Sequence, residues 1–207
     1  MSSTEASKHE ILQAVRRNRP AERALPTIAH EWTTYPDPRA KFSEVLELVG
    51  GSTIVARNVG DMQRQLSQLS QVASAAKIAS LIPGFVSANV DVAALAAPHD
   101  SADIDVAILP GEFAVAENAA VWATDEHVPI RVLYFLCQHL VLIVPADQIV
   151  DHMHAAYERL TRGSTNSLSV PRFGAFISGP SKTADIEQTL VVGAHGPRSL
   201  VVCFLES

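Results

Sequence analysis

Two apolar runs near the C-terminus, Phe173–Ile177 and Leu200–Leu205, constrain the fold more than any other part of the chain. Each has the length and composition of a buried strand. A polar turn separates them, followed by a helical pattern with Ile186 and Leu190 on one face and Gly193 as its stop. Strand, helix and strand in this order predict a βαβ unit. We therefore expect an open α/β fold that binds ligands at the carboxyl edge of its sheet.

The rest of the chain alternates strand-like and helix-like segments. Strands are expected at 53–56, 78–81, 104–109, 119–123, 130–136 and 140–144, and helices at 7–19, 42–49, 59–73 and 149–160. Such alternation is typical of a mostly parallel sheet covered on both faces by helices. The predicted fold class is α/β, with three α/β/α layers.

The N-terminal region differs from this pattern. Ser7 and Glu10 form a capping box that predicts a first helix ending near Arg19. Residues 20–38 are rich in proline and hold two aromatic residues, which favours an ordered segment wrapping the core. A mobile lid or an oligomer arm is the alternative. We expect an N-terminal helix and extension over 1–40 and an α/β domain over 41–207.

Composition narrows the function classes. The net charge of −6 argues against a nucleic-acid or anionic-membrane surface. The polar N-terminus does not resemble a signal peptide, and no apolar run is long enough to cross a bilayer, so a cytoplasmic location is expected. The two cysteines, Cys137 and Cys203, lie inside apolar runs and are predicted to be buried, reduced thiols. Two thiols cannot ligate an ordinary four-thiolate iron–sulfur cluster.

Two stretches resemble a known family. The sequence SGPSKTADIEQTLVVGAHGPRSL is similar to the C-terminal signature of the LUD-domain family, that of lactate utilization protein C (LutC/YkgG), and Asp105–Val144 resembles its other characteristic stretch. The resemblance covers roughly Phe42–Glu206. It implies a NagB/RpiA/CoA-transferase-like fold. It also implies a part in a bacterial system that oxidises L-lactate to pyruvate with separate iron–sulfur subunits, in an accessory or substrate-binding role.

The turn after Phe173–Ile177 is a candidate ligand site. Amides at a helix start, hydroxyls and one lysine can cradle an anion. The alternative is a well-capped helix with Pro180 in its first turn. Acids that follow the turn would repel phosphate, so a small polar or carboxylate ligand, or a hydrogen-bonded structural role, is favoured over a phosphate. The predicted ligand-binding residues here are Ser178, Gly179, Ser181, Lys182, Thr183, Asp185 and Glu187.

Glu117 and Asn118 form a second candidate site, with Glu117 as the catalytic candidate and Asn118 as a ligand-binding one. CoA transferases of the related fold carry a nucleophilic glutamate in a Ser-Glu-Asn-Gly motif, to which Glu117-Asn118 is similar. This chain has Ala116 and Ala119 at the flanks, and the missing glycine argues against nucleophilic chemistry. We expect Glu117 to be partly buried near the sheet edge. The alternative is a hydrogen-bonded acid that organises a turn.

The remaining candidates are His139 and His195, which suit polar contacts or proton transfer. The spacing of the eight histidines fits no common metal motif, and no dinucleotide, phosphate-loop or nucleophile-elbow motif is present, so neither a metal nor a cofactor is expected. Two further functions stay open: a stand-alone enzyme that uses Glu117 for acyl transfer, and a small-carboxylate sensor.

Overall fold

The computed structural model describes residues 3–24, 30–161, 173–184 and 190–206. The chain divides into two units, Met1–Trp32 and Thr33–Ser207. The first unit contains α1 (Ser3–Arg17), which begins a full turn before Ser7. Ser7 is therefore not a helix cap, because the good helix formers Glu5 and Ala6 extend the helix upstream of it.

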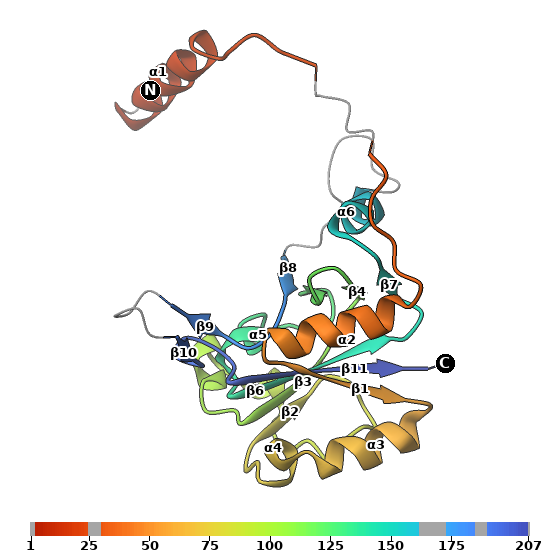
Figure 1. The fold of residues 1–207 in the computed structure, drawn as a ribbon. Helices are drawn as coiled ribbons and strands as arrows, with labels where there is room; N and C mark the ends of the chain where they lie inside the picture. Colours follow the sequence, from red (N-terminus) through yellow and green to blue (C-terminus); the bar gives the residue numbers. More distant parts are fainter. Residues whose placement is uncertain (1–2, 25–29, 162–172, 185–189, 207) are drawn as a thin grey trace. The chain divides into compact units, whose positions relative to one another are not determined.

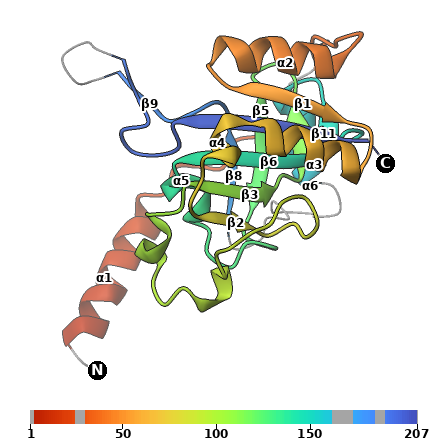
Figure 2. The ribbon, with the colours of Figure 1, turned by 90° about the horizontal axis from the view of Figure 1, so that it is seen from below.

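A five-stranded, all-parallel sheet forms the centre of the second unit. Its strands lie in the order β1 (Ser52–Ala56), β11 (Ser199–Leu205), β6 (His139–Pro145), β3 (Val106–Pro110) and β2 (Ile78–Ser80), as Figure 2 shows. The three inner strands are buried along most of their length. Burial on both faces explains why these segments read as continuous apolar runs.

Helices cover both faces of this sheet. In Figure 1, α2 (Pro38–Leu48) lies on one side, and α3 (Val59–Gln68) and α4 (Ser70–Ala73) lie on the other. The Asn58 side chain accepts a hydrogen bond from the Asp61 amide at 2.9 Å and so caps α3. Extended backbone at Leu69 interrupts the predicted helix 59–73.

A second sheet of mixed direction lies on the α2 side and was not predicted. It contains β7 (Ile149–Val150), β4 (Phe113–Val115), β5 (Ala120–Thr124) and β8 (Gly174–Ile177) in that order. One face of this sheet packs with α2 against the parallel sheet in a single apolar cluster. Its other face packs against α6 (Met153–Thr161) through Phe113, Trp122 and Phe176. The fold is α/β, as expected, but three α/β/α layers describe it incompletely.

The predicted βαβ unit is wrong, because its two strands belong to different sheets. β8 pairs antiparallel with β5, and the ring centroids of Phe176 and Trp122 lie 4.6 Å apart, whereas β11 lies in the parallel sheet. Between them, β9 (Lys182–Thr183) and β10 (Val191–Val192) form an antiparallel pair. The β-branched residues of these strands favour extended backbone over helix. The centre of the predicted helix, 185–189, lies outside the described residues.

Shorter elements complete the described chain. The strand predicted at 130–136 is wrong, because α5 (Leu133–Leu136) occupies its second half. The buried Tyr134 hydroxyl of α5 lies 3.1 Å from the carbonyl oxygens of both Pro110 and Thr124, so it links the ends of β3 and β5. These contacts of Tyr134 stabilise a helical turn in a segment whose apolar composition alone does not distinguish helix from strand. Two 3₁₀ helices span Val92–Ala94 and Pro98–Ser101.

Both cysteines are buried, as predicted. Burial raises the pKa of the Cys137 thiol and of the Cys203 thiol to about 12. Neither thiol therefore ionises readily. Among the described helices, none combines the length and the apolar composition needed to cross a lipid bilayer.

Gly111, between β3 and β4, marks the closest approach of the two sheets. A Cβ atom at this position would lie 2.5 Å from Val121 Cγ1 and 2.9 Å from Val144 Cγ2. We expect Gly111→Ala to lower the free energy of unfolding by about 1 to 3 kcal/mol through overpacking, measured by urea denaturation. Gly60→Ala is the control, because its Cβ would meet only the Asn58 side chain at 3.5 Å. Equal stability of the two variants would contradict this packing.

Candidate functional site

The two segments predicted to form a site lie side by side. The Ser178 hydroxyl donates a hydrogen bond to the Asn118 carbonyl oxygen at 2.7 Å. The register of β5 and β8, which pairs Val121 with Ile177, brings both residues to the same end of the mixed sheet. The turn that follows β8 therefore meets the turn that joins β4 to β5. We call this contact and its flanking residues 117–120 and 178–183 the signature junction.

The signature junction borders the amino edge of the parallel sheet, not the predicted carboxyl edge. Gly179 packs so closely on Val49, just before β1, that a Cβ atom would lie 3.0 Å from the Val49 carbonyl oxygen. The Ser181 amide donates to the Pro197 carbonyl oxygen at 2.9 Å, just before β11. The predicted edge is wrong because β8 belongs to the mixed sheet, so its carboxyl end does not coincide with that of the parallel strands.

Glu117 is exposed, which corrects its predicted partial burial. Its carboxylate Oε1 accepts a hydrogen bond from the Met153 amide at 2.8 Å, at the start of α6. The ring Nδ1 of His152 accepts another, from the Ala155 amide at 3.1 Å. Glu117 therefore satisfies an amide that has no partner within the helix. This contact favours the alternative of an acid that organises a turn.

Ala119 adopts a backbone conformation that favours glycine. Its φ is 51°, and its side chain is fully buried. The Asn118 side chain stabilises this turn by accepting a hydrogen bond from the Ala120 amide at 3.2 Å. Ala119 occupies the place that glycine holds in the Ser-Glu-Asn-Gly motif. Alanine in this left-handed conformation costs about 1 kcal/mol relative to glycine.

The turn 178–183 has a different local structure from the one predicted. Gly179 has a φ of 71°, and Pro180 is buried. Lys182 and Thr183 form β9, so the amides predicted at a helix start are not available in that form. Lys182 is exposed, and its Nζ lies 3.5 Å from the position of a Cβ on Gly50. The surface therefore offers one cation beside polar groups. Asp185 and Glu187 lie outside the described residues.

The two candidate histidines differ in their surroundings. His139 opens β6, and its Nδ1 lies 2.8 Å from the Ser199 hydroxyl. Burial lowers the pKa of His139, the Arg198 charge lowers it further, and Asp105 acts in the opposite direction. His195 is exposed in the loop between β10 and β11. His139 belongs to the parallel sheet, whereas Asn118 and Ser178 border the mixed sheet.

Sequence reasoning missed several residues around the junction. Gly50 received no role, although it lies beside Lys182. Arg198 and Ser199 received no role, although both act on His139. Their position directly after the Gly-Pro pair of the signature was the one available signal. In the described part of the chain, no group of three or more His, Cys, Asp or Glu side chains is arranged to hold a metal ion.

Comparisons with known proteins identify relatives of this chain. The LUD domain profile matches residues 39–205. Lactate utilization protein C of Oceanobacillus iheyensis is 30% identical over 93 residues, which cover 45% of this chain and 40% of that protein. The Geobacillus thermodenitrificans protein of the same name is 34% identical over 113 residues, 53% of this chain and 42% of that protein. The chain thus spans about two fifths of the length of the curated relatives it matches.

A solved structure shares the fold. The crystal structure of a DUF162 family protein from Deinococcus radiodurans superposes with a TM-score of 0.56 at 14% identity, covering 81% of this chain and 96% of that one. At this level of identity the likeness concerns the fold alone.

Replacing Gly179 tests the packing of the signature junction. Gly179→Ala should destabilise the protein by about 2 to 3 kcal/mol, because the new methyl group combines left-handed backbone with a clash against Val49. Gly84→Ala isolates the backbone effect, since Gly84 has a φ of 89° but no atom within 4 Å of its Cβ position. It should cost only about 1 kcal/mol. Thermal or urea unfolding measures the free energy of unfolding of both variants. Equal losses in Gly179→Ala and Gly84→Ala would show that Gly179 is not packed against Val49.

His139 should make stability depend on pH. Its pKa in the folded protein lies below the ordinary value of 6.5, so the unfolded chain binds the proton more readily. Stability is therefore lost as the pH falls below that value and is unaffected by His139 above it. Between about pH 7.5 and about pH 5.5, His139→Gln should lose less stability than the wild type. His195→Gln controls for removal of an imidazole, and identical pH profiles for His139→Gln and wild type would contradict the prediction.

Proposed function

The chain belongs to the LUD-domain family, and from that premise we propose that it is a component of a bacterial L-lactate utilization system, which oxidises lactate to pyruvate. The observation that carries this proposal is the signature junction, because it joins the two stretches in which the chain resembles the family. The hydrogen bond from Ser178 to Asn118 and the tight seat of Gly179 on Val49 support a fixed arrangement there. The names of the relatives supply the pathway.

Separate iron–sulfur subunits are part of the same proposal. Lactate oxidation releases electrons, and thiolate-bound clusters are common carriers of electrons. This chain has two cysteines, both buried, with each pKa raised to about 12. They are poor cluster ligands because a ligand thiol must ionise. The proposed role of this chain is therefore accessory or substrate-binding.

A substrate-binding role would place a small carboxylate at the amino edge, near Lys182. The exposed ammonium group lies next to Gly50, where the missing side chain leaves the backbone accessible. The hydroxyl groups of Ser181 and Thr183 lie on the same short segment. A single exposed cation suits a carboxylate better than a phosphate ester, which needs more positive charge.

We also propose that the fold is related to the NagB/RpiA/CoA-transferase group. The parallel sheet and the glycine-like backbone of Ala119 support this relation. Acyl transfer by Glu117 receives less support, because its carboxylate already accepts the Met153 amide. A carboxylate-sensing role uses the same junction and differs from the first proposal only in its partners.

Deletion of the gene tests the proposed function in a source organism whose genome encodes the neighbouring subunits. The deletion strain should fail to grow on L-lactate and should grow on pyruvate, and the tagged protein should co-purify with iron–sulfur proteins. When the deletion strain is complemented with the Lys182→Gln variant, it should grow more slowly on L-lactate than with the wild-type gene. Complementation with Lys8→Gln, which removes another exposed lysine, should restore full growth. Normal growth of the deletion strain on L-lactate would contradict the proposal.

A further inference from the structure

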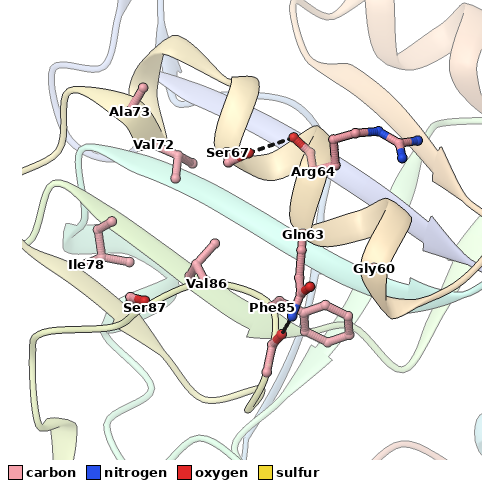
Figure 3. A pocket seen from close by; sticks show the side chains of 11 residues that line it. Gly60, Gln63, Arg64, Ser67, Val72, Ala73, Ile78, Phe85, Val86 and Ser87 are labelled. Atoms are coloured by element: carbon pink, nitrogen blue, oxygen red, sulfur yellow. Dashed lines mark hydrogen bonds between the residues drawn. The ribbon is translucent and has the colours of Figure 1, made fainter.

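A groove on the opposite face of the parallel sheet from the mixed sheet has no role in the function proposed above. Its volume is about 810 Å³, within the range of small-molecule sites, and it lies between the helices α3–α4 and the segment 84–87 that follows β2. Figure 3 shows Val72 on the helical wall, and Ile78 and Val86 on the opposite wall. The Gln63 amide bridges the two walls by donating to the Gly84 carbonyl oxygen.

The apolar residues that line this groove are continuous with the core. Val72 and Phe85 are 8% and 6% exposed and belong to the cluster that buries this face of the sheet. A ligand's apolar body would therefore rest on fixed side chains rather than on mobile surface groups. Among the described lining residues, Arg64 is the single charged side chain. The groove thus favours an apolar body and disfavours a cation.

A smaller hollow continues the groove past Gly60. Gly60 and Arg64 line both spaces, and Arg57, Asn58 and Asp61 complete the second. The guanidinium of Arg64 points away from Val72 in Figure 3. Arg64 also lines the smaller hollow. Arg64 pairs with Asp61 at the surface, and its side chain is 67% exposed. An exposed pair contributes little free energy, so Arg64 can exchange this partner for a ligand anion.

The charge of the smaller hollow is positive within an acidic protein. Its lining residues include two arginines, Arg57 and Arg64, and one acid, Asp61, while the chain as a whole carries a net charge of −6. The Asp61 carboxylate already accepts hydrogen bonds from the Arg57 amide and the Gln65 side chain, at 3.1 Å each. The residues that line the hollow therefore carry one more positive than negative charge, which favours an anion.

From this juxtaposition we propose that the groove and the hollow form one site for a monocarboxylic acid with an apolar chain or ring. The carboxylate binds Arg64 and Arg57, and the apolar body extends past Gly60 onto Phe85, Val72 and Ile78. Gly60 permits this path because it has no side chain between the two spaces. The site is separate from the signature junction and does not depend on the function proposed for it. L-lactate, which lacks an apolar body, is not its ligand.

Amide-resolved NMR titration tests the site with octanoate and phenylacetate. Both acids should shift the amide signals of Gly60, Arg64 and 84–87, and should bind about tenfold more tightly than octanamide and phenylacetamide, which lack the charge. L-lactate should leave these signals unchanged. The proposal would be overturned if the acids shifted signals elsewhere instead, or if acids and amides bound with equal affinity. It would also be overturned if the groove signals shifted with protein concentration in the absence of acid. The last result would indicate a second copy of the chain in the groove.

Matched variants separate the two parts of the site. Gly60→Gln should weaken binding of both acids by about tenfold or more, because its side chain fills the passage. Gly60→Ala should bind nearly as well as wild type, since its Cβ meets only the Asn58 side chain. Arg64→Gln should reduce the affinity for each acid to that for its amide, whereas Arg17→Gln, which changes an exposed arginine in α1, should not. Unchanged binding by a folded Gly60→Gln variant would overturn the proposal.

Discussion

The structure depends on covering both faces of a parallel sheet whose inner strands are almost wholly apolar. Each uncovered face would expose rows of Val, Ile and Leu, and roughly 25 cal/mol of stability would be lost per square ångström. Helices α3 and α4 cover one face, and α2 shares the other with the mixed sheet. Gly111 makes this second contact possible, because the methyl groups of Val121 and Val144 occupy the space of its missing side chain.

The position of the signature residues follows from the use of a second sheet to cover one face of the parallel sheet. Because β8 pairs with β5 in the covering sheet, the chain must cross from the mixed sheet to the parallel one before β11 begins. The described residues that follow β8 lie at the amino edge, where Gly179 contacts Val49 and Ser181 contacts Pro197. The polar residues that carry the family resemblance are thus a connection between two sheets. Their glycines and prolines have a structural reason as well as the proposed functional one.

The sequence predicted the parallel strands well and the mixed sheet poorly, for physical reasons. β6 and β11 are long apolar runs, because both of their faces are buried. The start of α3 follows from Asn58, whose side chain can cap a helix. The segments of β5 and β8 were predicted as strands, but β4 and β7 are too short to show a period, and the pairing of all four into one sheet is decided by tertiary contacts. For the site, residue chemistry was enough to select Asn118 and Ser178. It could not predict at which edge of the sheet they lie, because that edge depends on the pairing of β8 with β5. The groove beside α3 has no sequence motif, since its lining comes from separate segments and none of them carries a pattern of its own.

A disulfide between β5 and β8 tests the arrangement most directly. Ala123 and Ala175 are register partners in the structure, so their Cα atoms lie about 4.5 to 5.5 Å apart, within reach of a disulfide. The variant with Ala123→Cys and Ala175→Cys should form this bond on mild oxidation, whereas Ala123→Cys combined with Ile177→Cys, which is out of register, should not. The native thiols should not interfere, because both are buried and their pKa values are raised. A folded first variant that stays reduced would show that β8 does not pair with β5, and the signature junction would have to be abandoned.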